Sequence, residues 1–171
     1  LRMQRSFRYK DGVLTLDKIS QTFFVGDFQE EKSDYSLNYK SDGQSVRSTT
    51  FFYYGDNSKI AQAADPEDRL VRQDTYKGQQ AREINEDGTE VFDESARLQS
   101  QTYFKGIFQE EKADFTDAYK LDGTLRSRTL NFYEDDDADP ATFDDATNAD
   151  AEAALRMQRS FRYKDGVLTL D

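Results

Sequence analysis

The chain has 171 residues, of which 34 are acidic and 23 basic, so that its net charge is −11, and it contains neither Cys nor His. These absences exclude disulfides, thiolate metal sites and Ser-His or Cys-His catalysis, and the negative charge argues against nucleic acid as a partner. Aromatic residues make up 13% of a chain that is 33% charged, which favours strands with one packed and one wet face over a disordered tail.

The first seventeen residues, LRMQRSFRYKDGVLTLD, return unchanged at 155–171. The offset from Leu1 to Leu155 gives a period of 154 residues. We therefore expect the chain to be a window of a tandem array, slightly longer than one period, and 155–171 to begin the next unit. Repetition at a fixed period is typical of solenoids, propellers and other arrays.

In chain order, runs rich in Thr, Tyr, Phe and Val predict strands. They lie at 3–10, 19–25, 34–40, 46–54, 70–77, 98–104, 114–120 and 125–133. Because glycine-containing turns separate them, we expect a mainly β fold: an antiparallel meander of β-hairpins, arranged as a solenoid of tandem repeats.

Five Asp-Gly pairs mark the predicted hairpin turns, because this dipeptide readily adopts the positive φ angles of tight turns. The turn residues are Asp11, Gly12, Asp42, Gly43, Asp87, Gly88, Asp122, Gly123, Asp165 and Gly166.

Tyrosines and phenylalanines form the predicted aromatic strand faces. A sugar-stacking platform is one interpretation, and packing of cross-strand aromatic pairs is the one we favour. The residues are Phe51, Phe52, Tyr53, Tyr54, Tyr103, Phe104, Phe132 and Tyr133.

Two Asp-Pro pairs interrupt the strand pattern. Asp65-Pro66 places a capping acid before a proline suited to the first helical turn, and Asp139-Pro140 does the same ahead of an Ala-rich stretch. These signals predict short helical segments near 65–72 and 140–154.

A weaker repeat lies inside the 154-residue period. Residues 22–43 align without gaps to 102–123, with 13 of 22 positions identical. We therefore divide the chain into a first half-repeat, 1–68, a second half-repeat with an acidic linker, 69–154, and the start of the next unit, 155–171.

The Tyr-Asp-Gly pattern of Tyr9-Lys10-Asp11-Gly12 and Tyr119-Lys120-Leu121-Asp122-Gly123 resembles YD (RHS-type) repeats. The runs RSTTFFYYGD and FQEEKADF are similar to units of very large bacterial surface proteins of the adhesin or hemagglutinin type. The resemblance covers most of the chain outside 135–154. It implies an extracellular β-rich spacer or fibre and supplies no catalytic residues.

Acidic residues give two alternatives to a purely structural chain. The segment 134–152 is a candidate for weak Ca²⁺ binding, although it lacks EF-hand spacing, and we favour a solvated linker with no cofactor. Glu30-Glu31 and Glu110-Glu111 suggest the carboxylate pair of a glycosidase. Adjacent strand residues point to opposite faces, however, so the two carboxylates of a pair cannot converge on a substrate, and we expect no enzyme. Each pair is followed by a lysine, Lys32 or Lys112, which we assign to a charged hairpin edge.

The favoured function is a structural repeat of an extracellular or cell-surface bacterial fibre, or of a giant adhesin stalk. Its units would assemble in one dimension by stacking of strands, and its partners would be copies of itself or adjacent repeats of one chain. No nucleic acid and no membrane span are expected. The alternative is a module that binds a glycan or a surface protein through exposed tyrosine faces.

Overall fold

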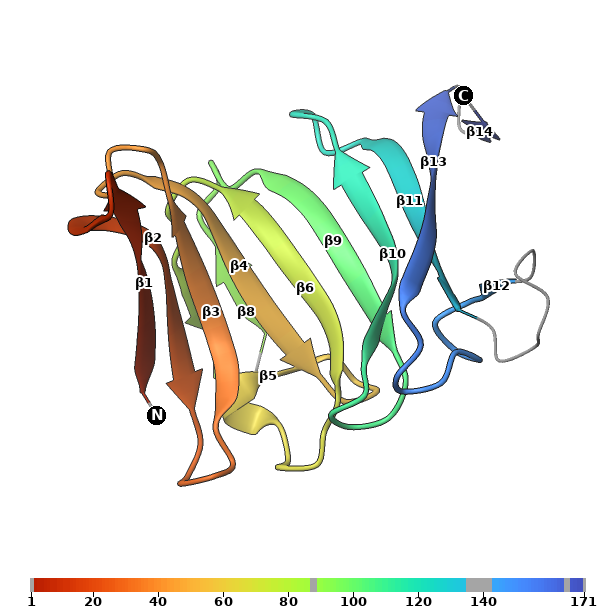
Figure 1. Cartoon of the computed structure of the whole chain (residues 1–171), viewed down its shortest axis with the longest axis horizontal. Helices are drawn as coiled ribbons and strands as arrows, with labels where there is room; N and C mark the ends of the chain where they lie inside the picture. Colours follow the sequence, from red (N-terminus) through yellow and green to blue (C-terminus); the bar gives the residue numbers. More distant parts are fainter. Residues whose placement is uncertain (1, 87–88, 135–142, 165–166, 171) are drawn as a thin grey trace.

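The computed structural model describes residues 2–86, 89–134, 143–164 and 167–170. One large antiparallel sheet dominates it, with the strand order β1-β2-β3-β4-β6-β9-β10-β11-β13-β14 (Figure 1). Its long strands and the C-terminal β14 are β1 (Met3–Lys10), β2 (Val13–Val25), β3 (Lys32–Tyr39), β4 (Val46–Tyr54), β6 (Leu70–Lys77), β9 (Leu98–Lys105), β10 (Lys112–Tyr119), β11 (Leu125–Glu134), β13 (Leu155–Lys164) and β14 (Val167–Leu170). Two short strands lie beside this order: β5 (Lys59–Ile60) pairs with β4, and β12 (Phe143–Asp144) pairs with β11.

The predicted mainly β, antiparallel meander is confirmed. Consecutive long strands are neighbours, and the sheet is open, with β1 at one edge and β14 at the other (Figure 1). Among the residues described, no helix is long and apolar enough to cross a membrane.

The predicted helix near 65–72 is wrong. Asp65–Asp68 is a tight turn in which the Asp68 amide donates to the Asp65 carbonyl at 2.9 Å, and β6 starts at Leu70. One 3₁₀ turn, Ala61–Ala63, precedes it. Residues from Leu70 onward gain backbone hydrogen bonds to β4 and β9 on both sides, which outweighs a local capping signal.

The predicted helix at 140–154 is wrong where the structure describes it, and residues 140–142 lie outside the described part. Phe143–Asp144 form β12 against β11, and turns follow. The Asp145 carboxylate accepts hydrogen bonds from the amides of Thr147 and Asn148 at 2.9 and 3.1 Å. This local capping closes turns in place of the expected helix.

The sheet consists of two similar four-strand units, β1 to β4 and β6-β9-β10-β11, followed by the hairpin β13–β14. β4, the last long strand of the first unit, ends at Tyr54 and β6 starts at Leu70, and the division of the chain at 68/69 stays a prediction. Phe23 stacks on Tyr35 at 4.4 Å and 17°, and the equivalent Tyr103 stacks on Phe115 at 4.5 Å and 22°. The recurring sequence thus forms the same local structure twice.

The loops before β3 and β10 also match. Gly26 and Gly106 have φ angles of 110° and 108°, and an added Cβ would lie 2.6 and 2.7 Å from the carbonyl oxygens of Glu30 and Glu110. Both positions therefore require glycine.

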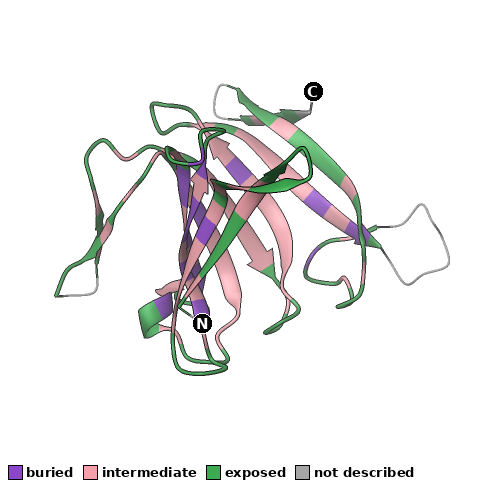
Figure 2. Ribbon diagram, turned by 60° about the vertical axis from the view of Figure 1, so that its left-hand side comes forward, coloured by how far each residue is buried: buried purple, intermediate pink, exposed green. Residues whose placement is uncertain are grey.

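A short hairpin packs against one face of the sheet at β3, β4 and β6. It consists of β7 (Arg82–Ile84) and β8 (Glu90–Phe92). Phe92 lies 5.4 Å from the Phe51 ring and stacks on Tyr76 at 4.8 Å. The Arg82 guanidinium lies above Phe51 and pairs with Asp34. Burial is therefore concentrated in the strands of the first unit, whereas β13 is largely exposed (Figure 2).

Candidate functional site: two equivalent strand junctions

The predicted hairpin turns that the structure describes lie at one end of the sheet (Figure 1). Asp11 and Gly12 have φ angles of 51° and 78° between the paired residues Lys10 and Val13, as in a two-residue type I′ turn.

Asp42-Gly43 and Asp122-Gly123 occupy longer loops. The Asp42 carboxylate accepts hydrogen bonds from the amides of Gln44 and Ser45. The Ser45 hydroxyl and, after it, these two amides lower the pKa of Asp42 to about 2. Asp122 accepts from the Thr124 amide. The other predicted turn residues, Asp87, Gly88, Asp165 and Gly166, lie outside the described residues.

The predicted aromatic residues lie inside the molecule to different degrees. Four are buried, namely Phe51, Tyr53, Tyr54 and Tyr133, and four are half-buried, namely Phe52, Tyr103, Phe104 and Phe132. They belong to packed contacts, such as the chain of neighbouring rings from Phe23 through Tyr35 to Phe51. These positions offer no broad exposed platform.

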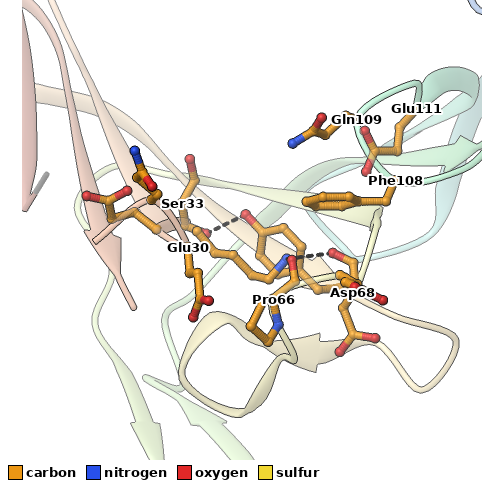
Figure 3. Close-up of a pocket in the computed structure, with 12 residues that line it drawn as sticks. Glu30, Ser33, Pro66, Asp68, Phe108, Gln109 and Glu111 are labelled. Atoms are coloured by element: carbon orange, nitrogen blue, oxygen red, sulfur yellow. Dashed lines mark hydrogen bonds between the residues drawn. The ribbon is translucent and has the colours of Figure 1, made fainter. Parts of the chain in front are cut away.

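Lys32 is the centre of the first junction, where β4 passes to β6. Its side chain comes from the start of β3 and is only 7% exposed. The ammonium donates to the carbonyl oxygens of Pro66 at 3.0 Å and Asp68 at 2.6 Å, and lies 4.8 Å from the centre of the Tyr54 ring (Figure 3). Tyr54 in turn donates its hydroxyl to the Ser33 carbonyl at 2.8 Å.

The second unit also contributes to this junction. Phe108 places its ring 5.1 Å from the Lys32 ammonium, and a Glu111 carboxylate oxygen accepts the Leu70 amide at 2.9 Å, at the first residue of β6. Burial lowers the pKa of Lys32, although Asp68 and Glu111 offset part of this effect.

A pocket of about 340 Å³ surrounds these groups. It is lined by Gln29, Glu30, Glu31, Lys32, Ser33, Tyr54, Pro66, Glu67, Asp68, Phe108, Gln109 and Glu111 (Figure 3). The Lys32 ammonium already donates to two carbonyl oxygens and contacts two rings, so it is not a free nucleophile. We call it a tether, because it fastens the segment between β4 and β6 to β3.

A second junction, where β11 passes to β13, repeats the first. Lys112 donates to the carbonyl oxygens of Ala151 at 2.7 Å and Ala153 at 3.0 Å and lies 5.2 Å from the Tyr133 ring. Tyr133 donates its hydroxyl to the Ala113 carbonyl at 2.7 Å. The tethered segments correspond: ADPED (64–68) and ADAEA (149–153) share Ala, Asp and Glu, and each lysine binds the carbonyls of the third and fifth residues.

The strand registers of the two junctions are also the same. Both ladders have seven paired positions with an irregularity before the last pair, and hydroxyl pairs 2.9 Å apart join Thr50 to Thr75 and Thr129 to Ser160. The register runs from Ser48↔Lys77 to Tyr54↔Leu70 in the first and from Ser127↔Arg162 to Tyr133↔Leu155 in the second. β13 therefore occupies the position of β6.

Sequence reasoning missed these tethers. The recurring FQEEK motif marked both lysines, but we assigned them to a charged hairpin edge, whereas Lys32 is buried and Lys112 half-buried. Glu30 and Glu31 lie in the loop before β3 and not on a strand, so the strand-face argument does not apply to them. Within the described residues, no group of three or more acidic side chains is placed to hold a metal; residues 135–142 of the Ca²⁺ candidate 134–152 lie outside them.

No protein-family model matches the chain, and searches of curated proteins and of solved structures found no significant similarity. The resemblance to YD repeats and adhesin units therefore stays a prediction.

Proposed function

We propose that the chain is a structural repeat of an extracellular bacterial fibre or giant adhesin stalk, in which each 154-residue period continues the sheet of the preceding one. The observation that carries the proposal is the equivalence of the two junctions. One joins the halves of a period, and the other joins the period to β13, whose sequence is that of β1.

The copied segments support the same conclusion. Tyr9 pairs with Leu14 and Lys10 with Val13, while Tyr163 pairs with Leu168 and Lys164 with Val167. The Thr15 hydroxyl donates to the Arg8 carbonyl at 3.0 Å, and the equivalent Thr169 hydroxyl donates to Arg162 at 3.3 Å. The hairpin thus starts in the same way in both copies, as a repeating sheet requires.

A chain of two successive periods tests the proposal. One period contributes eight strands to the main order of the sheet, so at about 4.8 Å between strands the second period should lengthen the sheet by about 38 Å along its curve. Small-angle scattering should show a longer particle of unchanged cross-section. Two separate globules on a flexible linker would contradict the proposal.

The glycan- or surface-protein-binding alternative has less support, because the predicted tyrosine faces are largely packed. Tyr9 and Tyr163 are exposed, at 72% and 36%. They are the natural positions to change in a glycan-binding assay.

A further inference from the structure

The two edges of the sheet are related by the repeat. Within the described residues β1 pairs with β2 alone and leaves its other edge unpaired, whereas β13, identical in sequence, pairs with β14 on one side and β11 on the other. An unpaired strand edge is a template for another strand. Here the chain itself indicates which strand fits it.

The contacts between β13 and β11 are made by side chains that also occur in the first copy, in β1 and at the residue before it. Ser160 bonds Thr129 at 2.9 Å, the Gln158 amide donates to the Asn131 side-chain oxygen at 2.9 Å, and the Arg159 guanidinium lies 5.7 Å from the Phe132 ring. Arg156 pairs with Glu134. The corresponding residues of the first copy are Ser6, Gln4, Arg5 and Arg2.

We propose that the edge of β11 is an exchange site that accepts either the chain's own β13 or β1 of a second copy. This inference rests on the proposed function, since it assumes that successive units continue one sheet. The incoming β1 would take the register of β13 shifted by 154 residues, with Ser6 opposite Thr129 and Arg8 opposite Ser127. Separate chains would then join head to tail, and the heterologous contact would extend without closing.

Two differences decide which strand occupies the site. The chain's own β13 is favoured because it is covalently connected to β11, which gives it an effective concentration on the order of millimolar. The incoming β1 is favoured by preorganisation, because it is backed by the 13-residue β2 and the rest of a sheet, whereas β13 is backed by the 4-residue β14. We therefore expect monomers in dilute solution and exchange when β13 is weakened.

The exact repeat allows the same change to be made in either copy of the full chain. Adjacent strand residues direct their amides to opposite sides, so a double proline removes one hydrogen-bond donor from each edge. Arg159→Pro with Ser160→Pro should give dimers and longer oligomers in sedimentation as the concentration rises. Arg5→Pro with Ser6→Pro should remain monomeric, and so should the chain with all four changes. A monomeric β13 variant at millimolar concentration would overturn the proposal.

Because the chain has no Cys, introduced pairs report the register directly. Within one chain, six strands separate β1 from β11 in the sheet. Ser6→Cys with Thr129→Cys therefore forms a disulfide only between chains, and in the β13-weakened background it should give at least tenfold more cross-linked dimer than the out-of-register pair Ser6→Cys with Ser127→Cys. Thr129→Cys with Ser160→Cys, in the otherwise unchanged chain, is the control for the internal strand.

If that control closes an internal disulfide while the Ser6–Thr129 pair gives no cross-link, exchange between chains is wrong. The proposed function would then still stand or fall on the two-period chain, whose sheet is continuous or interrupted whether or not separate chains join.

Discussion

Replacing Lys32 by Met removes the tether of the first junction while keeping most of the buried side-chain volume. The change leaves the carbonyls of Pro66 and Asp68 without their ammonium donor and the Tyr54 ring without its cation. Lys112→Met is the matched change in the second junction, where the lysine is half-buried and one of its two hydrogen bonds is exposed.

A hydrogen bond to a charged group contributes about 1.5–3 kcal/mol, and a cation–ring contact about 1 kcal/mol. These contributions involve one shared ammonium and are therefore less than additive. Lys32→Met should therefore lower the free energy of unfolding by about 3 kcal/mol. For Lys112→Met, water can replace part of the lost interaction, and we expect a loss of about 1 kcal/mol.

Urea unfolding followed by circular dichroism measures both values. Lys10→Met, at an exposed side chain near the end of β1, serves as the control and should change stability by less than about 0.5 kcal/mol. If Lys32→Met cost no more than this control, the tether would contribute nothing to the junction. Equal losses at Lys32 and Lys112 would refute the argument from burial.

Three further changes test other parts of the structure. Tyr54→Phe deletes the hydroxyl that donates to the Ser33 carbonyl and should cost about 1 kcal/mol in urea unfolding, with an unchanged fold by circular dichroism; no loss would mean that water satisfies that carbonyl equally well. Gly26→Ala places a Cβ 2.6 Å from a backbone oxygen at a φ of 110° and should cost more than about 2 kcal/mol, whereas a normal melting temperature would show that the loop relaxes freely. The pKa of Asp42 is lowered from 3.8 to about 2, so the stability contributed by its turn should be fully present above pH 3.8 and lost as the pH falls toward 2; a carboxyl resonance titrating near 3.8, or the same acid sensitivity in Asp42→Asn, would contradict this.

The strands could be predicted because their signal is local. Met3–Lys10, Val46–Tyr54 and Leu70–Lys77 coincide with expected runs, since alternation and turn residues mark their ends. β2 was predicted only from Ile19 onward, although it begins at Val13. The three-residue strands β7 and β8 are too short for a periodic signal, so only the turn between them was expected.

The junctions could not be predicted because they depend on distant partners. The capping signal at Asp65-Pro66 favours a helix, yet Lys32 binds carbonyls in that segment from more than 30 positions away in sequence. Lysine is rarely buried, which is why its recurrence in FQEEK indicated a surface edge. A comparison of both copies of FQEEK with Tyr54, the last residue of β4, and Tyr133, the last but one of β11, is the signal that would have connected them.

Lys32 and Lys112 donate hydrogen bonds to backbone carbonyl oxygens, which every amino acid supplies. The side chains at the bound positions are consequently free to differ: ADPED and ADAEA differ only at their third and fifth residues, whose carbonyls the lysines bind. Such a loop is a natural insertion point: a foreign domain could be grafted beside residue 150, provided that the two bound carbonyls keep their places, and in the proposed fibre it would recur once in every period.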